Sequence, residues 1–222
     1  MENQPKTRKR PSNPYVVQWR MFCEIAGRRK RAKNLFGIEY LFLMSICAGL
    51  MFMPTMLVRA VSDRFGYFPR KLAIEFYVIA KPLALLWILF SERAFSTPWA
   101  TVTTLMFVDL YLYLCGLVFL RRFYTPPASP ARSLLLLGVN FLEASLAFAI
   151  FYGFSDSIKG ATSPLKLLYF SLVTSATVGY GDMMPKSDTG MQLVICQILS
   201  SLGFASIFIA TFVTKLNEQE AI

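Results

Sequence analysis

The most distinctive chemistry in this chain lies in two glycines and their neighbours, within the stretch TSATVGYGDMMP. Gly179 and Gly181 alternate with Val178 and Tyr180 in an otherwise apolar C-terminal half. Glycine enters the left-handed backbone region without steric cost, so alternating glycines let successive carbonyl groups point toward one axis. Such a row of oxygens can replace the water shell of a bare cation. The pattern therefore predicts a backbone-carbonyl ion site, with the hydroxyl of Thr177 at its inner end.

The elements around this motif must hold it inside a membrane. The chain has 222 residues, 55% of them hydrophobic, and its mean hydropathy is +0.48. Crossing a bilayer takes about 20 consecutive apolar residues. Five runs approach that length: Leu35–Leu57, Leu72–Phe90, Trp99–Leu120, Leu134–Phe154 and Met191–Val213. The first run begins too late to be a cleaved signal peptide. The composition predicts an all-α, multi-pass membrane protein.

A short helix should precede the glycine motif. Ser163 can cap a helix and Pro164 suits its first position, so PLKLLYFSLVTSA is predicted to be helical from there. About 13 residues are too few to cross a bilayer. A short helix followed by extended chain is typical of a re-entrant pore loop, which is tolerated only where it lines a wet path or is buried in protein. The negative C-terminal end of that helix would face the ion path.

The segment from about Leu134 to Lys215 resembles the pore domain of the tetrameric potassium channel family, on the motif TVGYGD and its flanking helices. The resemblance implies an outer helix, a pore helix, a filter and an inner helix, assembled as a homotetramer. The resemblance implies no cofactor, and K⁺ is expected only as the permeant ion. The implied selectivity filter is Thr177, Val178, Gly179, Tyr180 and Gly181, with K⁺ held at the first four.

The same resemblance suggests residues that support the filter. Tyr169 and Phe170 stand where family members often carry two tryptophans on the pore helix, and the Tyr169 hydroxyl could bond Asp182. Glu143 could supply the carboxylate that some members place behind the filter. An alternative is a protonated Glu143 bonded to Ser171 or Thr174. The family's inner-helix hinge corresponds to two candidate positions, Ser201 and Gly203.

The N-terminal tail, residues 1–34, is strongly basic. Ten of the 23 Lys and Arg lie in the first 33 residues. A nucleic-acid tail is one interpretation, but a tail running straight into an apolar span fits anionic lipid headgroups on the cytoplasmic face better. We therefore expect membrane lipids and no nucleic acid as partners. Tyr15–Ile25 is either a short interfacial helix or disordered.

Residues 35–121 contain three hydrophobic segments and resemble no family. A voltage-sensing helix would carry Arg or Lys at every third position, and no run has that pattern. Lys81 and Asp109 lie near the centres of their runs; a sensor is one interpretation, but we expect them to form a structural intramembrane pair. An external filter with a cytoplasmic tail requires an even number of crossings before residue 122. Leu72–Phe90, interrupted by charges and Pro82, is the segment expected to lie embedded without crossing.

The remaining composition argues against enzymatic chemistry. The chain has no histidine, and its four cysteines form no CxxC motif. No nucleophile set or carboxylate pair with a base points to an enzyme. A linker, residues 122–133, precedes the pore domain at 134–215, and a short tail follows at 216–222. The expected function is passive potassium conduction across the cell membrane with both termini cytoplasmic; the alternative is a weakly conducting subunit or sensor that works by interaction.

Overall fold

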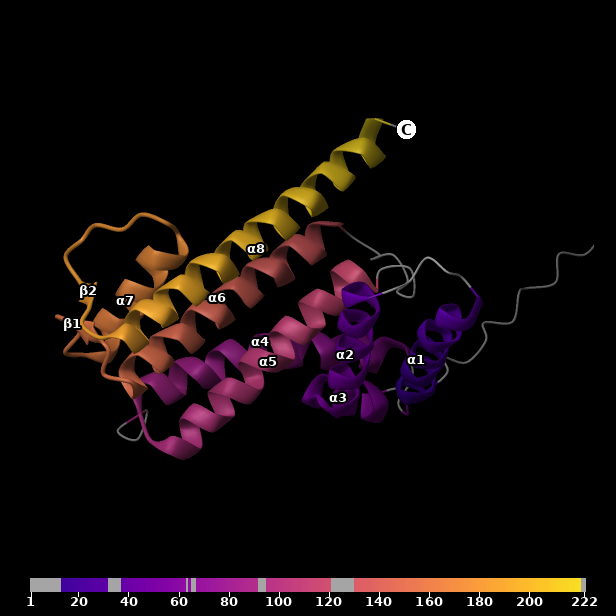
Figure 1. Ribbon diagram of the computed structural model, residues 1–222, viewed down its shortest axis with the longest axis horizontal. Helices are drawn as coiled ribbons and strands as arrows, with labels where there is room; N and C mark the ends of the chain where they lie inside the picture. Colours follow the sequence, from indigo (N-terminus) through magenta and orange to yellow (C-terminus); the bar gives the residue numbers. More distant parts are fainter. Residues whose placement is uncertain are drawn as a thin grey trace, which may run out of the picture. The chain divides into compact units, whose positions relative to one another are not determined.

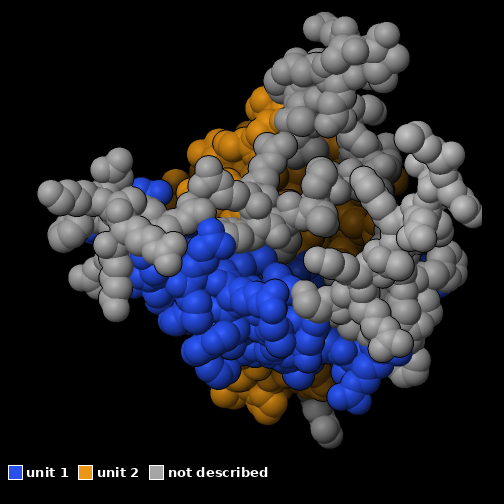
Figure 2. All heavy atoms as spheres, turned by 90° about the vertical axis from the view of Figure 1, so that its right-hand side faces the viewer, with its two compact units in different colours: residues 1–75 blue, residues 76–222 orange. Residues whose placement is uncertain are grey.

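The computed structural model describes residues 13–31, 37–62, 64, 67–91, 95–120 and 130–220. The basic residues from Lys6 to Arg10, the linker from residue 121 to 129 and Arg93 lie outside these ranges. The chain divides into two compact units, residues 1–75 and 76–222, coloured separately in Figure 2. Helices dominate both units, which confirms the predicted all-α fold class.

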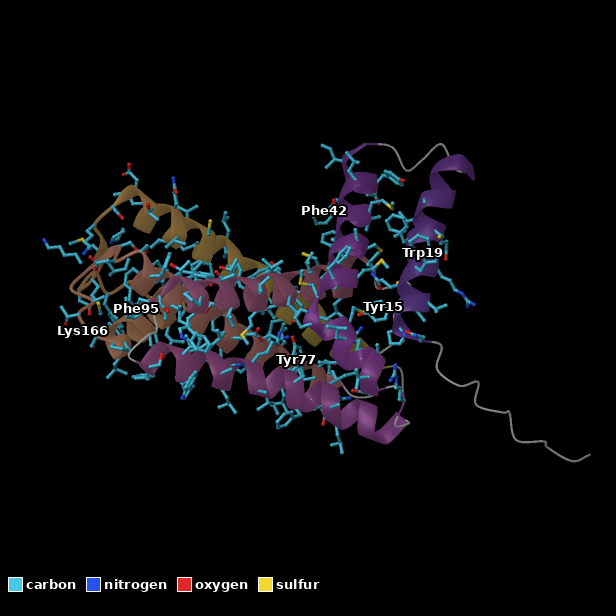
Figure 3. All side chains as sticks on the ribbon, turned by 90° about the horizontal axis from the view of Figure 1, so that it is seen from below. Tyr15, Trp19, Phe42, Tyr77, Phe95 and Lys166 are labelled. Atoms are coloured by element: carbon cyan, nitrogen blue, oxygen red, sulfur yellow. The ribbon has the colours of Figure 1, made fainter. Side chains whose placement is uncertain are left out.

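The first unit contains three helices: α1 (Pro14–Arg31), α2 (Ile38–Phe52) and α3 (Pro54–Ser62). The α1 helix packs against α2 and α3, and Gln18 Nε2 donates a hydrogen bond to the carbonyl oxygen of Cys47 at 3.3 Å. Residues 15–25 are thus helical, in line with the first of the two sequence interpretations. Trp19 on this helix is 55% exposed and stacks on Phe22 (Figure 3). An exposed indole is typical of a helix at a membrane surface.

A sharp bend interrupts the first apolar run. The α2 and α3 helices meet at Met53 and Pro54 and are bent by 60°, as in a broken span or a re-entrant loop. Proline supplies the break, since it cannot donate the backbone bond that would continue the helix. The segment expected not to cross was Leu72–Phe90, yet it forms part of an unbroken helix long and apolar enough to span.

The second unit is built from four long helices and one short one (Figure 1). The α4 helix (Tyr67–Phe90) enters this unit at Phe76 and continues through Pro82. It is followed by α5 (Thr97–Phe119), α6 (Pro130–Phe154), α7 (Pro164–Ser175) and α8 (Asp188–Glu220). Four candidate spans result from the described helices: Leu72–Phe90, Thr97–Phe119, Arg132–Phe154 and Asp188–Ala210.

The α6 helix organises the core of this unit. It packs against α5, α7 and α8, and it runs alongside α8 in Figure 1. Its buried face includes Ala147, Ile150 and Tyr152, all inaccessible to solvent. Within a membrane this face is stabilised by close van der Waals packing against the neighbouring helices. The result is a firm scaffold against which α7 and the glycine motif are placed.

A candidate ion-conducting site

The short α7 helix begins as the sequence predicts. The backbone N–H of Lys166 donates to Ser163 Oγ at 3.4 Å, and Pro164 occupies the first turn. The helix is 12 residues long, and it ends at Ser175. In Figure 3, Lys166 lies at the end of the unit where this segment turns, the same end as Phe95. The predicted cap and the predicted short helix are both confirmed.

The glycine motif leaves α7 as extended chain. The N–H groups of Thr177 and Val178 still bond carbonyl oxygens of Thr174 and Val173, each at 3.0 Å. Beyond that point the backbone alternates: φ is +56° at Thr177, +58° at Gly179 and +78° at Gly181. Left-handed residues at every second position rotate successive peptide groups so that their carbonyls can share one side. The threonine is an addition to the sequence prediction, which required this conformation only of the glycines.

Space is not the reason for the two glycines. A Cβ added at Gly179 or Gly181 would meet nothing within 4 Å in the described chain. Their positive φ values are the constraint, because L side chains rarely adopt that conformation. The motif is also open, with Val178 51% and Tyr180 69% exposed. An apolar and an aromatic side chain so exposed indicate a surface that another molecule covers.

A small antiparallel ladder holds the chain on the far side of the motif. Strand β1 (Ile158–Lys159) pairs with β2 (Met184–Pro185). Nearby, the Lys186 N–H donates to the Ser157 carbonyl at 2.8 Å, and Lys186 Nζ lies 2.7 Å from Asp156 Oδ2. These bonds join the loop after α6 to the chain that leaves the glycine motif. The motif is thereby fixed at both of its ends.

Tyr169 and Phe170 take different directions from α7. The ring of Tyr169 stacks on Tyr180, and its side chain faces the carboxylate of Asp182. Phe170 is instead buried and meets the ring of Tyr152 on α6 edge to face, 5.1 Å between centroids. Of the two aromatic positions expected to support the filter, Tyr169 contacts it and Phe170 anchors α7 to the scaffold.

Glu143 lies elsewhere than we expected. Its Oε1 is 2.9 Å from Lys81 Nζ, so it faces α4 and not the back of the filter. Ser171 Oγ donates to the Ser145 carbonyl at 2.6 Å, so its proton is not given to Glu143. The ammonium of Lys81 explains this direction, since a buried carboxylate is far better compensated by a cation than by a hydroxyl. Lys81 also lies 3.5 Å from Asp109 Oδ2.

The position expected behind the filter is filled by a neutral network that the sequence reading missed. Gln197 on α8 is fully buried, and its Nε2 donates to Ser171 Oγ at 2.8 Å and to Ser175 Oγ at 2.6 Å. Its Oε1 accepts from the Tyr152 hydroxyl at 2.5 Å. Ser145 Oγ completes the network by donating to Ser175 at 3.0 Å. An amide in the middle of an apolar span is the signal that could have pointed to it.

The two candidate hinge residues differ in their surroundings. Ser201 is buried, with 7% of its surface exposed. Gly203 lies in open space, because a Cβ added there would meet nothing within 4 Å. The α8 helix runs through both of them from Asp188 to Glu220. Just before them, the hydroxyls of Ser200 and Tyr111 share a hydrogen bond, which links α8 to α5.

Comparison with known proteins places this site in context. Residues 140–218 match a family model described as "Ion channel". A two pore potassium channel a from Oryza sativa subsp. japonica is 33% identical over 90 residues, covering 40% of this chain and 25% of that protein. A two pore potassium channel b from the same plant is 35% identical over 91 residues, with the same coverages.

A third relative comes from another organism. A hyperpolarization-activated voltage-gated potassium channel from Methanocaldococcus jannaschii is 29% identical over 85 residues, covering 38% of this chain and 36% of that protein. The matched segment thus spans about a quarter to a third of these relatives. No solved structure matches the chain. The matched family and the relatives are ion channels, not enzymes, and the C-terminal membrane region of this chain is similar to them.

Proposed function

We propose that this chain assembles as a homotetramer into a potassium-selective channel, in which ions pass down their gradient along the backbone of residues 177–181. The observation that carries the proposal is the alternation of left-handed backbone at Thr177, Gly179 and Gly181, directly after a short membrane helix. Oxygens fixed at that spacing replace the ion's hydration shell. The C-terminal end of α7 adds its partial negative charge at the entrance to this row.

One chain supplies one row of oxygens, which cannot surround an ion by itself. The α8 helix supports assembly of several copies, because only 17% of its span is buried within the described chain, against 56% for α6. Its exposed apolar side chains include Met191, Ile195, Leu199 and Leu202. We propose that α8 and the filter face the central axis and the neighbouring copies. Four rows of carbonyls then enclose each ion.

The distribution of basic residues supports one membrane topology. We propose that α4, α5, α6 and α8 cross, and that the bent pair of α2 and α3 enters and leaves on the cytoplasmic side. Ten basic residues of the tail, four in 59–71 and three in 121–132 then lie inside, and Arg93 alone lies between α4 and α5 outside. The pore-loop lysines are external in every arrangement with an external filter. Two other arrangements place fewer basic residues on the cytoplasmic side. In one, the bent pair, α4 and α5 all cross; in the other, the bent pair and α5 cross while α4 stays embedded.

Potassium flux from the purified chain in liposomes tests the proposal. Potassium-loaded vesicles that contain the protein should lose potassium, as protein-free vesicles do when a potassium ionophore is added as a control. The flux should increase with the amount of protein. Sodium-loaded vesicles should show little flux. A protein that inserts as an oligomer yet carries no potassium would favour the alternative, a weakly conducting subunit or sensor. The alternating left-handed backbone at Thr177, Gly179 and Gly181 favours conduction, because it lets successive carbonyls share one side.

A further inference from the structure

Three ionisable side chains meet in the interior of the second unit, outside the filter. Lys81 of α4, Asp109 of α5 and Glu143 of α6 are 5%, 0% and 1% exposed. Lys81 Nζ lies 2.9 Å from Glu143 Oε1 and 3.5 Å from Asp109 Oδ2. One ammonium thus stands between two carboxyl groups. With all three ionised, the cluster carries a net charge of −1, which is costly within a membrane-spanning bundle.

The two carboxyl groups are not equally provided with partners. Asp109 Oδ2 accepts a hydrogen bond from the Tyr77 hydroxyl at 3.0 Å in addition to its contact with Lys81. Figure 3 labels Tyr77, and Lys81 Nζ lies 5.2 Å from the centre of its ring. Both oxygens of Glu143, in contrast, are buried with no hydrogen-bond partner among the described residues, and Oε2 also lacks the ion-pair contact that Oε1 makes with Lys81. A buried carboxylate oxygen without a donor is strongly disfavoured, whereas a protonated one carries no charge to compensate.

The other helices that pack against α6 bring no charge to this cluster. On α7 and on residues 188–210 of α8, the charged side chains are Lys166 and Asp188, each in the first turn of its helix. Their other titratable groups are Tyr169, beside the filter, and the exposed Cys196. The α5 helix adds the neutral Tyr111, Tyr113 and Cys115. The described residues contain no group of three His, Cys, Asp or Glu suited to a metal ion.

We propose that Lys81, Asp109 and Glu143 form a proton-binding site, with the proton on Glu143 Oε2, and that its occupancy controls the pore. A proton there brings the net charge of the cluster from −1 to zero, with Asp109 between Tyr77 and Lys81 as the remaining carboxylate. Its loss leaves an uncompensated charge where α4, α5 and α6 meet. Proton binding stands on the geometry alone, while the control of current rests on the proposed channel function.

The cluster has a short physical route to the pore. Glu143 lies on α6, which packs against both α7 and α8. Asp109 lies on α5 two residues before Tyr111, whose hydroxyl shares a hydrogen bond with Ser200 on α8. Ser200 is adjacent to the candidate hinge at Ser201. A shift of α5 or α6 that follows loss of the proton therefore acts on the inner helix directly.

Infrared difference spectroscopy of the full chain in liposomes, between acidic and alkaline buffer, tests the site itself. We expect the carbonyl stretch of a protonated buried carboxyl group, shifted in D₂O, to disappear as pH rises. Glu143→Gln should lack this band, because an amide balances the cluster without a proton. Asp188→Asn removes an exposed carboxylate from the same unit and should keep it. Wild-type protein without such a band, or a band unchanged in Glu143→Gln, overturns the site.

Two further arms make the result independent of folding and of channel function. Replacing all Na⁺ and K⁺ by a large organic cation should leave the wild-type band unchanged; a band that appears only then means that a metal cation, not a proton, fills the site. Potassium flux should depend on pH in wild type and lose that dependence in Glu143→Gln. Equal pH dependence in both overturns the control of the pore. If neither protein conducts, the proposed function fails while the infrared band still decides the site.

Discussion

The ring of Tyr169 on the pore helix lies flat against the ring of Tyr180 in the filter, with 6.4 Å between centroids and 5° between planes. The same side chain faces Asp182. Partial desolvation and the neighbouring carboxylate of Asp182 raise the pKa of the Tyr169 phenol above its ordinary value. A phenol is protonated throughout the neutral range, so it can donate to that carboxylate. One residue thereby braces the filter at two points.

Removing only the hydroxyl should weaken one of these contacts and keep the other. In Tyr169→Phe the ring remains on Tyr180, but Asp182 loses its donor. We expect faster decay of potassium current during sustained activity, slowed again by raising external potassium, which refills the outer ion sites. Current recordings from reconstituted protein measure both effects. Decay at the wild-type rate in Tyr169→Phe, with faster decay in Asp182→Asn, would assign the aspartate to another partner.

The amide of Gln197 should matter for stability. In Gln197→Leu the buried Tyr152 hydroxyl loses its acceptor, and such an unsatisfied group costs about 1–3 kcal/mol; Ser171 and Ser175 lose a donor but keep their hydrogen bonds to Ser145. Thermal unfolding followed by size-exclusion chromatography should show a lower melting temperature. Gln192→Leu, an exposed glutamine one and a half turns earlier on the same helix, is the matched control and should melt like wild type. Equal melting of the two variants would contradict a stabilising network.

The contrast between Gly179 and Gln197 shows what the sequence could predict. The pore helix, its cap at Ser163 and the glycine conformations follow from local rules, because the residues that impose them are neighbours in the chain. Gln197 bonds residues 22 to 45 positions away, and no local pattern specifies such partners. The direction of Glu143 likewise depended on Lys81, a residue from another helix. The bend at Met53 was not predicted, because the mean hydropathy of the run Leu35–Leu57 does not register the single proline that breaks the helix.

Membrane orientation can be read by cysteine labelling from outside, in a background without the four native cysteines. Cysteines introduced singly at Lys9, Arg64 and Lys186 discriminate among the topologies. We expect labelling at position 186 alone, because the bent pair returns to the cytoplasmic side before residue 64. Labelling at 64 and 186 would mean that α2 and α3 cross and α4 does not. Labelling at 9 and 186 would mean that all three segments cross.

The central claim is that a row of backbone carbonyls selects potassium, and the reversal potential with potassium on one side of the membrane and sodium on the other tests it most directly. We predict a strong potassium preference in the wild type. Gly179→Ala should lose that preference, because its φ of +58° is strained for an L side chain although the added Cβ meets nothing within 4 Å. Gly138→Ala, a helical glycine of α6 whose Cβ is equally unobstructed, should keep it. An unchanged reversal potential in Gly179→Ala, or none that favours potassium in the wild type, would contradict the account.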